Sequence, residues 1–373
     1  MFLEKLLLIN YRNYHYQALS FSPGLNMIIG DNAQGKTNLL ESVFLSARGK
    51  SFKRLGDRDL IRFGERSGYV RADMNRNDRM KSVEIKLSMI ERKRIRINEV
   101  EVDNIKDLSN QFEVVLFAPE DLQIIKDSPD FRRDFLDDLL KGIYPVYGPL
   151  LREYQKILSQ RNNLLKSSSS SWFSEQLAAL DRQLVDSAVE LVEYRKQLGK
   201  ELAEEAARIH LRLTDGSEDL QVTYRSNTLT EETASRSLQK EEFRQSLTGL
   251  LEGSRARDLD YRNTDIGPHK DDLDIFINGN PARKYASQGQ SRTAVLTLRL
   301  AELAILEHYN RTAPILLLDD VFSELDQYRT EYLLKAIGGY QTLVTTNQLD
   351  GFPANPEIGQ VFKVVNGQIS HLK

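Results

Sequence analysis

The chain has 373 residues and a formal net charge of −3, with 51 Lys and Arg against 54 Asp and Glu. This length is typical of two domains, or of one large domain with an insertion, and 40% apolar with 28% charged residues excludes a disordered or fibrous protein. The charge excludes a surface that is basic throughout, so any contact with nucleic acid must come from a local patch. The absence of cysteine excludes disulfides, thiolate zinc sites and a cysteine nucleophile, and five histidines do not favour a multi-histidine metal site.

No apolar run reaches the roughly 18 residues that a membrane-spanning helix needs. The first ten residues are apolar, but Glu4 and Lys5 interrupt them. This pattern predicts a first strand rather than a secretion signal, and we therefore expect a cytoplasmic protein without membrane contact.

Short apolar runs at strand length dominate the first 120 residues, separated by polar or glycine-containing turns. We expect strands at residues 6–9, 25–29, 68–73, 83–88 and 114–117. Residues 36–47 predict a helix, because their apolar residues recur three and four positions apart.

A helical pattern follows this strand-rich part. Near-heptad apolar spacing predicts helices at 146–165 and 175–209, with five consecutive serines at 167–171 between them. The pair is typical of antiparallel helices joined by a flexible turn. Since the longer helix would reach only about 50 Å, the pair is either a short projecting arm or a helical subdomain packed on the core.

Strands and helices alternate again from residue 271 onwards. We expect strands at 273–277, 315–318, 343–345 and 361–365 and a helix at 290–308. This order predicts an α/β nucleotide-binding head split by an insertion. We expect the N-terminal part of the head at residues 1–125, an all-helical arm domain at 126–262 and the C-terminal part of the head at 263–373, with mixed sheets in the head.

The segment GDNAQGKT at residues 30–37 matches the phosphate-loop pattern G-x-x-x-x-G-K-[ST], between an apolar strand and an amphipathic helix. Its glycines allow backbone angles that turn successive N–H groups into one concavity, where they can bind phosphate oxygens. We expect Lys36 to reach the β- and γ-phosphates and the Thr37 hydroxyl to bind Mg²⁺.

Four aliphatic residues at 315–318 end in Asp319 and Asp320. A buried parallel strand that delivers an acid at its carboxyl end is where α/β sheets place their ligands. We expect Asp319 to accept from a water bound to Mg²⁺ and Asp320 to polarise the attacking water. Because two carboxylates would repel a triphosphate, the site needs Mg²⁺.

The segment SQGQ at residues 287–290 precedes a long amphipathic helix. It is either a plain helix N-cap or a surface where Gly289 lets the backbone approach an anion closely.

The phosphate loop, SQGQ, the acidic strand end and SELD at 323–326 occur in the order found in ABC-type ATPase heads, where they resemble Walker A, the signature motif, Walker B and the D-loop. Together with NYRNY at 10–14, LFAPED at 116–121 and GPHKDD at 267–272, they resemble the RecF family over nearly the whole chain. The resemblance implies a DNA-repair ATPase of the SMC-like branch that binds double-stranded DNA and junctions with single-stranded gaps. It also implies RecR and RecO as partners, loading of recombinase on gapped DNA and a location at the nucleoid.

In such heads, ATP binds the phosphate loop of one subunit and the signature motif of a second subunit closes over it. The resemblance therefore implies an ATP-dependent homodimer with Lys36, Asp319 and Asp320 as catalytic residues and Thr37 and Asp319 as metal ligands. Asp326 would cross the dimer interface. The implied ATP-binding residues are Arg12, Asn13, Gly30, Asp31, Asn32, Ala33, Gln34, Gly35, Lys36, Thr37, Asn38, Ser287, Gly289 and Gln290.

The sequence departs from transport-type heads at three places. Asp320 stands where those heads carry the longer Glu, which predicts slow hydrolysis. No His follows the strand at 343–345, so Thr346 or Asn347 would have to sense the γ-phosphate. No Gln stands plainly after the strand at 114–117, where Glu120 and Gln123 are the candidates.

Two basic clusters are candidates for DNA contact. The first follows the phosphate-loop helix and contains Arg48, Lys50, Lys53 and Arg54, and the second occupies residues 92–96. Each is either a phosphate-binding patch or solvated charge, and the alternation of charge with Ile in the second is also typical of an edge strand. For His269, a turn residue bonded to neighbouring backbone is favoured over a catalytic role.

Three functional classes are compatible with a phosphate loop. The leading one is an ATP-switched DNA-repair protein with weak, DNA-stimulated ATPase activity. A transport head is disfavoured by the helical insertion, by the missing switch His and by Asp320. A small-molecule phosphotransferase needs an acceptor pocket with a base and does not need residues 287–290.

Overall fold

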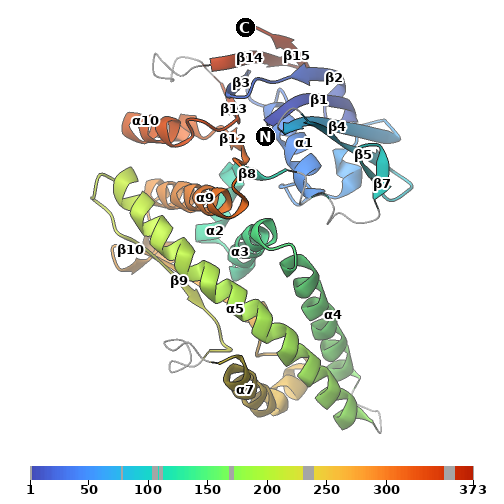
Figure 1. Cartoon of the computed structure of the whole chain (residues 1–373), viewed down its shortest axis with the longest axis vertical. Coiled ribbons are helices and arrows are strands. Elements are labelled where there is room, and N and C mark those ends of the chain that lie inside the picture. The colour runs from blue at the N-terminus through green and yellow to red at the C-terminus, as the bar shows by residue number, and fades with distance from the viewer. Residues whose placement is uncertain are drawn as a thin grey trace. The chain divides into compact units, whose positions relative to one another are not determined.

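The computed structural model describes residues 2–76, 79–102, 108, 112–167, 172–229, 239–347 and 358–372 (Figure 1). The chain forms two compact units. The first consists of Met1–Leu122 and Leu296–Lys373, and the second of Gln123–Val295. Residues 263–295, which we expected in the head, thus belong to the second unit.

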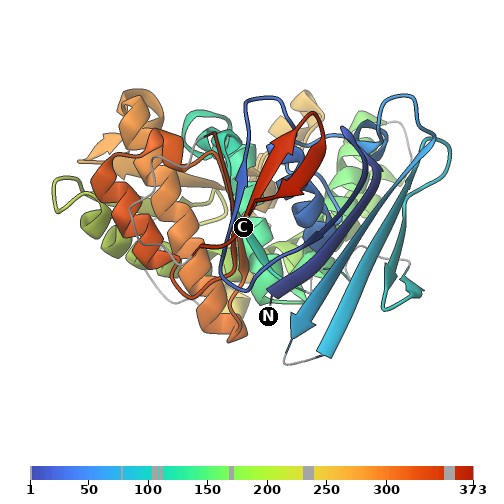
Figure 2. The ribbon, with the colours of Figure 1, turned by 90° about the horizontal axis from the view of Figure 1, so that it is seen from above.

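An antiparallel sheet in the first unit has the strand order β2-β1-β4-β5-β6-β7, and Figure 2 shows its long strands side by side in blue. A bulge between Leu3 and Lys5 in β1 keeps both Leu3 and Leu6 in the core. The basic cluster at 92–96 enters β6, which is an interior strand because the short β7 covers its outer edge. The strands are β1 (Phe2–Tyr11), β2 (Tyr14–Ser20), β4 (Ser67–Arg76), β5 (Arg79–Ser88), β6 (Arg94–Ile97) and β7 (Val100–Val102).

A second sheet of the first unit has the order β15-β14-β3-β13-β12-β8. Its strands β14, β3, β13, β12 and β8 are parallel, and β15 is an antiparallel edge strand. The apolar runs at 25–29 and 315–318 form interior strands, as expected of strands covered on both faces, and the run at 114–117 forms the buried edge strand β8. The strands are β3 (Leu25–Ile29), β8 (Val114–Phe117), β12 (Ile315–Asp319), β13 (Thr342–Thr346), β14 (Ile358–Val365) and β15 (Gln368–His371).

Helix α1 (Lys36–Arg48) packs against β4 and β5 of the first sheet and β8, β12 and β13 of the second. One hydrophobic core therefore joins both sheets through this helix. Because the helix is covered on two sides, its polar residues Glu41, Ser42 and Ser46 are buried. The remaining elements of this unit are η1 (Asp57–Leu60), η3 (Pro119–Leu122), η5 (Phe322–Glu324), α10 (Gln327–Ala336) and the greater part of α9 (Gln288–Asn310).

The second unit contains the two expected long helices, α4 (Tyr147–Lys166) and α5 (Phe173–Leu213). They are antiparallel, because Arg161 late in α4 bonds Asp181 early in α5, whereas Tyr147 at the start of α4 bonds Arg195. Residues 168–171 of the serine run lie outside the described residues. The other helices are α2 (Gln123–Lys126), α3 (Pro129–Ile143), α7 (Lys240–Tyr261), η4 (Pro268–Lys270) and α8 (Ala282–Tyr285).

The prediction of an all-helical insertion is wrong, because this unit has a three-stranded sheet of order β11-β10-β9. Strand β9 (Leu220–Arg225) lies inside the segment that we expected to be helical, and it pairs with β10 (Asp272–Ile277), which adjoins β11 (Asn280–Pro281). Leu220, Val222 and the partly buried Tyr224 alternate with exposed residues in β9, and this two-residue period is too short to stand out in the sequence. Among the described residues, no helix combines the length and apolar character that crossing a bilayer requires.

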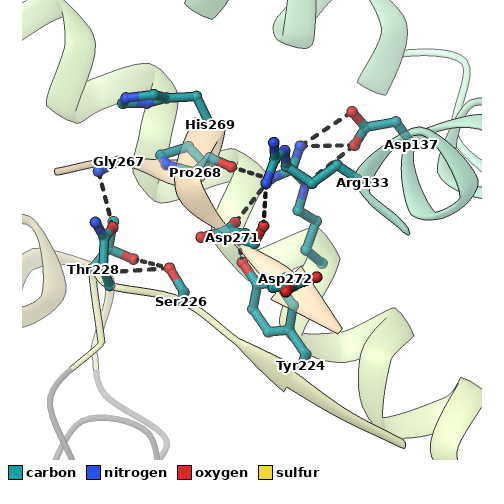
Figure 3. Close-up of polar contacts among 12 residues, drawn as sticks. Arg133, Asp137, Tyr224, Ser226, Thr228, Gly267, Pro268, His269, Asp271 and Asp272 are labelled. Carbon is teal, nitrogen blue, oxygen red and sulfur yellow. Dashed lines mark hydrogen bonds and ion pairs between the residues drawn. The ribbon is translucent and has the colours of Figure 1, made fainter. Parts of the chain in front are cut away.

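The motif at 267–272 lies in a buried polar network of the second unit (Figure 3). Asp271 is fully buried, and its Oδ2 accepts hydrogen bonds from Arg195 at 2.8 Å and from Tyr224 at 2.5 Å. Arg133 donates to the Asp271 carbonyl at 2.6 Å, and Asp137 pairs with the same Arg195. Burial raises the pKa of Asp271, and the charge of Arg195 opposes this rise. The network connects α3 and α5 with the three-stranded sheet. The motif at 267–272 therefore has a structural role.

Candidate nucleotide-binding site

The phosphate loop connects the end of β3 to the start of α1. Ala33 and Gly35 have φ values of 65° and 117°, in the left-handed region. No side chain caps the helix at Gly35, so the first-turn N–H groups remain available to an anion. Asp31, Asn32 and Ala33 are exposed beside this helix end. The left-handed backbone expected at Gly35 is therefore present, whereas Gly30 is needed for a different reason, because a Cβ there would lie 2.5 Å from the Val364 carbonyl oxygen.

Lys36 is folded back onto this loop. Its Nζ donates to the Gly30 carbonyl at 2.5 Å, to the Asp31 carbonyl at 2.9 Å and to Asn347 Oδ1 at 2.7 Å. Burial lowers the pKa of Lys36, although Asp320, Asp319 and Asp31 oppose this shift. Of the two candidates for γ-phosphate sensing, Asn347 thus contacts the phosphate-loop lysine through its side chain.

Thr37 and Asp319 meet as the sequence predicted, with the Thr37 hydroxyl donating to Asp319 Oδ1 at 3.0 Å. Thr345 at the carboxyl end of β13 donates to the same oxygen at 2.7 Å. The sequence analysis missed Thr345, although its place at the end of a strand next to the acidic one was a usable signal. Burial raises the pKa of Asp319, the hydrogen bonds from Thr345 and Thr37 and the charge of Lys53 lower it, and Asp320 adds to the rise.

Asp320 has a left-handed backbone, with φ of 53°. Its N–H donates to Thr345 Oγ1 at 2.9 Å, and its carbonyl accepts from Ser323 Oγ at 2.8 Å. The carboxylate oxygen Oδ1 is buried without a hydrogen-bond partner in the described part of the chain. A strained non-glycine residue with an unsatisfied carboxylate oxygen is typical of a functional site.

The donor set fits Mg²⁺ that arrives with a nucleotide. Thr37 and Asp319 would hold the ion from the protein side. The described residues contain no group of three or more His, Cys, Asp or Glu side chains suited to a metal. Mg²⁺ usually binds a protein through one or two carboxylates and completes its coordination shell with phosphates and water, and Thr37 with Asp319 fits this pattern.

The side chains of Arg12 and Asn13 lie beside the phosphate loop and helix α1, but in this structure they bind protein groups. Arg12 donates to both oxygens of the buried Glu41 at 2.7 and 2.9 Å. Asn13 donates to the Gln34 carbonyl at 2.8 Å and accepts from Asn38 at 2.9 Å. A contact of these four side chains, Arg12, Asn13, Gln34 and Asn38, with nucleotide stays a prediction.

The segment at 287–290 forms a capping box at the start of α9. The Ser287 N–H donates to Gln290 Oε1 at 3.0 Å, and the Gln290 N–H donates to Ser287 Oγ at 3.1 Å. The Gln290 amide also donates to Glu218 at 3.0 Å. Ser287 and Gly289 are exposed, and a Cβ at Gly289 would meet no atom within 4 Å. The N-cap is confirmed, and the backbone at Gly289 is open to close approach.

After β8, the neighbouring acids Glu120 and Asp121 differ in their hydrogen bonds. Asp121 accepts hydrogen bonds from the Ala118 N–H and from Nε and Nη2 of Arg299, whose Nη1 donates to Glu302. Glu120, in contrast, has a buried Oε2 without a partner among the described residues. Of the candidates Glu120 and Gln123 at this loop, Glu120 is the one with an unsatisfied buried oxygen.

The structure joins the two basic clusters. Lys93 donates to the Gly49 carbonyl at 2.6 Å and to Asp57 at 2.8 Å, which ties the β5–β6 turn to the segment after α1. Arg48 is an exception, because it pairs with Glu113 at 2.8 Å and is largely buried, so it is not part of the exposed surface. We call residues 49–66 and 89–96 the basic surface. They contain ten Lys and Arg against four Asp and Glu.

Comparisons with known proteins find similarity over nearly the whole chain. A family model described as the RecF/RecN/SMC N terminal domain matches residues 2–370. The DNA replication and repair protein RecF of Lachnoclostridium phytofermentans is 39% identical over 371 residues, which cover 99% of both chains. That of Bacillus cytotoxicus is 40% identical over 352 residues, which cover 94% of this chain and 93% of the relative.

Solved structures are similar over the same length. The structure of the recombination mediator protein RecF with ATP in the RecFOR pathway has a TM-score of 0.91 at 34% identity and covers 100% of this chain and 98% of that one. An Smc head bound to the C-terminal winged-helix domain of ScpA has a TM-score of 0.57 at 17% identity, with 100% and 98% covered, which shows a shared fold alone. The chain therefore belongs to the RecF family of DNA replication and repair proteins, within the ABC-type ATPases.

Proposed function

We propose that this chain is an ATP-dependent DNA-binding protein of recombinational repair. ATP with Mg²⁺ binds at the phosphate loop and drives two heads together, and the homodimer clamps double-stranded DNA at junctions with single-stranded gaps. There it helps to load recombinase on single-stranded DNA, together with RecR and RecO. Slow, DNA-stimulated hydrolysis returns the heads to monomers. We expect this protein in the cytoplasm, at the nucleoid.

The uncapped start of α1 beside Thr37 and Asp319 supports nucleotide binding most directly. The RecF structure with ATP, at 34% identity, supports the same ligand. Bound Mg²⁺ would neutralise charge on the phosphates. The buried Oδ1 of Asp320, which has no hydrogen-bond partner in the described part of the chain, is the atom that we propose for accepting a hydrogen bond from the attacking water. Its short side chain is our reason to expect slow turnover.

The exposed capping box supports a contact in trans. The Ser287 hydroxyl and the open backbone at Gly289 are the groups that we propose for the γ-phosphate of a second copy. Gln290 holds Ser287 in place and is itself bound to Glu218. Since the triphosphate supplies the charge that this helix start attracts, hydrolysis would weaken the dimer.

Sedimentation of the wild type, Lys36→Met and Gly289→Ala with ATP and Mg²⁺ tests the proposal. We expect ATP to dimerise the wild type only. Gly289→Ala should retain ATP binding and an equal or slightly higher free energy of unfolding, because its Cβ meets nothing in its own chain and alanine restricts the unfolded chain. It should fail to dimerise, because the methyl group occupies the space of the γ-phosphate. An equal dimer population in all three proteins would overturn the clamp.

The basic surface supports contact with DNA, and it carries an unusual apolar feature. Phe63 is fully exposed and Ile90 is 83% exposed. The loop of Phe63 adjoins the turn of Ile90, because the Met89 N–H donates to the Arg66 carbonyl at 3.1 Å. Arg62 and Arg66 are close to Phe63 in sequence, and basic residues combined with an exposed aromatic ring are typical of sites that bind phosphates and stack an unpaired base. We propose that Phe63 contacts the DNA at the junction.

A further inference from the structure

Gln34 lies in the phosphate loop between two residues with an unusual backbone conformation. Its neighbours Ala33 and Gly35 both have left-handed backbones, with φ of 65° and 117°. A non-glycine residue such as Ala33 persists in this region only where its surroundings hold it there. The contacts that hold Gln34 come from two segments that are distant from it in the sequence.

The first segment is the turn of the β14–β15 hairpin. Asn366 and Gly367 have φ values of 49° and 72° and form a two-residue turn of the Asn-Gly kind. The Asn366 N–H donates to Gln34 Oε1 at 2.5 Å, and the Gly367 N–H donates to the Gln34 carbonyl at 3.2 Å. Both central N–H groups of the turn thus bind one residue of the phosphate loop.

The second segment is the β1–β2 turn, through Asn13. The Asn13 amide spans the loop, because it donates to the Gln34 carbonyl and accepts from Asn38 in the first turn of α1. The packing is close on both sides. A Cβ at Gly35 would collide with the Asn13 amide, and one at Gly367 would lie 2.5 Å from the Asn13 carbonyl oxygen.

The hairpin is itself firmly held. Strand β14 pairs in parallel with β3, the strand that enters the loop. The Gln17 amide in β2 binds Ile369 in β15 twice, accepting from its N–H at 3.1 Å and donating to its carbonyl at 3.2 Å. The turn is therefore a fixed support rather than a loose end.

We propose that Gln34 is a positioning residue, and that Asn13 and the Asn366–Gly367 turn form a brace that keeps the phosphate loop in its anion-binding shape. The Gln34 and Asn13 side chains then act on ATP binding through the shape of the loop. ATP affinity becomes dependent on the C-terminal hairpin. This inference rests on the proposed binding of ATP at the loop. Because such coupling is reciprocal, ATP must in turn stabilise the brace.

Gln34→Met tests the brace, since it keeps the length of the side chain and removes the acceptor. Its matched control is Gln17→Met, which removes two hydrogen bonds from the same hairpin without touching the loop. Calorimetric titration with ATP and Mg²⁺ should show about three- to tenfold weaker binding for Gln34→Met, the range expected for one hydrogen bond. Gln17→Met should bind like the wild type.

Hydrogen exchange supplies the reciprocal readout. In the wild type, ATP should slow exchange at the amides of Asn366 and Gly367, whereas in Gln34→Met the Asn366 amide should exchange fast with or without ATP. If Gln34→Met does not fold, Gly367→Ala tests the brace from the hairpin side and should also weaken ATP binding. Equal ATP affinity in the wild type and the folded variant would overturn the brace. Failure of the wild type to bind ATP would instead overturn the proposed function, and the brace with it.

Discussion

Thr345 connects the two acidic residues at the end of β12. Its hydroxyl donates to Asp319 and accepts from the Asp320 N–H, so one side chain orients both groups. Burial raises the pKa of Asp319, and the hydrogen bonds from Thr345 and Thr37 lower it. Because Mg²⁺ binds the ionised carboxylate, Thr345 helps to keep the metal ligand in its binding form.

Thr345→Val removes this hydrogen bond while keeping the shape of the side chain. The pKa of Asp319 should rise further, so Mg²⁺-dependent ATP hydrolysis should be lost at a higher pH as the solution is acidified. At pH 7 we expect turnover to fall about tenfold, consistent with about 1.5 kcal/mol for a hydrogen bond to a charged group. The check is kcat measured against pH. Thr342→Val in the same strand is the control, because Thr342 bonds the Tyr340 carbonyl instead. Coinciding pH profiles of all three proteins would contradict the role of Thr345.

Among the elements, α4 and the segment before β10 are joined through His269. The Tyr154 hydroxyl lies 2.6 Å from His269 Nδ1, and Nε2 lies 2.9 Å from the Thr264 carbonyl. A carbonyl only accepts, so Nε2 carries the proton and Nδ1 accepts from Tyr154 in a neutral ring. His269 is thus a turn residue bonded to neighbouring backbone, as the sequence favoured. Burial lowers the pKa of His269 to about 4, although the bond to Thr264 opposes this shift.

This shift makes stability depend on pH. The unfolded chain binds a proton at His269 below about pH 6.5, whereas the folded chain does so only near pH 4. Stability from this group is present above pH 6.5 and is lost as the pH falls toward 4. Between pH 8 and pH 5, protonation linked to His269 should lower the free energy of unfolding of the wild type by about 2 kcal/mol. Urea unfolding of the wild type and His269→Gln at both values checks this, and the variant should lose less. Equal losses would contradict the assignment.

Over the whole molecule, charge is segregated. The net charge is −3, yet the basic surface contains ten Lys and Arg against four Asp and Glu. Its two halves are 23 residues or more apart in sequence and meet through Lys93. A compact positive area on an acidic chain is suited to bind phosphates through release of counterions.

DNA affinity should therefore fall steeply with salt. Arg66→Gln with Arg92→Gln takes one exposed cation from each half of the basic surface. If both meet phosphates, the slope of log affinity against log salt should become shallower by about two. Phe63→Ala should weaken binding to a gap junction several-fold without changing this slope, since stacking involves no counterion. Lys5→Gln with Lys363→Gln is the control for lost charge elsewhere. An unchanged slope and affinity in the arginine pair would remove the basic surface from the proposal.

Local patterns predicted the central parts of the fold well. Strand β3, the phosphate loop and α1 follow one another directly in sequence, and β12 is a single apolar run. The spacing of their residues alone therefore indicates these elements. Strand β9 was predicted wrongly, because its alternating pattern spans only six residues and its partner β10 lies about 50 residues later. The sheet pairing of β14 with β3 likewise depends on residues at opposite ends of the chain.

The sequence by itself determined the chemistry of the site, because phosphate binding needs glycines, a lysine and a helix start in one short segment, and these are contiguous. Only the tertiary structure decided which groups support that chemistry. Thr345 reaches Asp319, Asn366 reaches Gln34 and Lys93 joins two basic clusters, because strand pairing brings distant segments within hydrogen-bond distance. The spacing of residues within one segment does not indicate such contacts, because each partner is an ordinary polar residue in its own stretch of sequence.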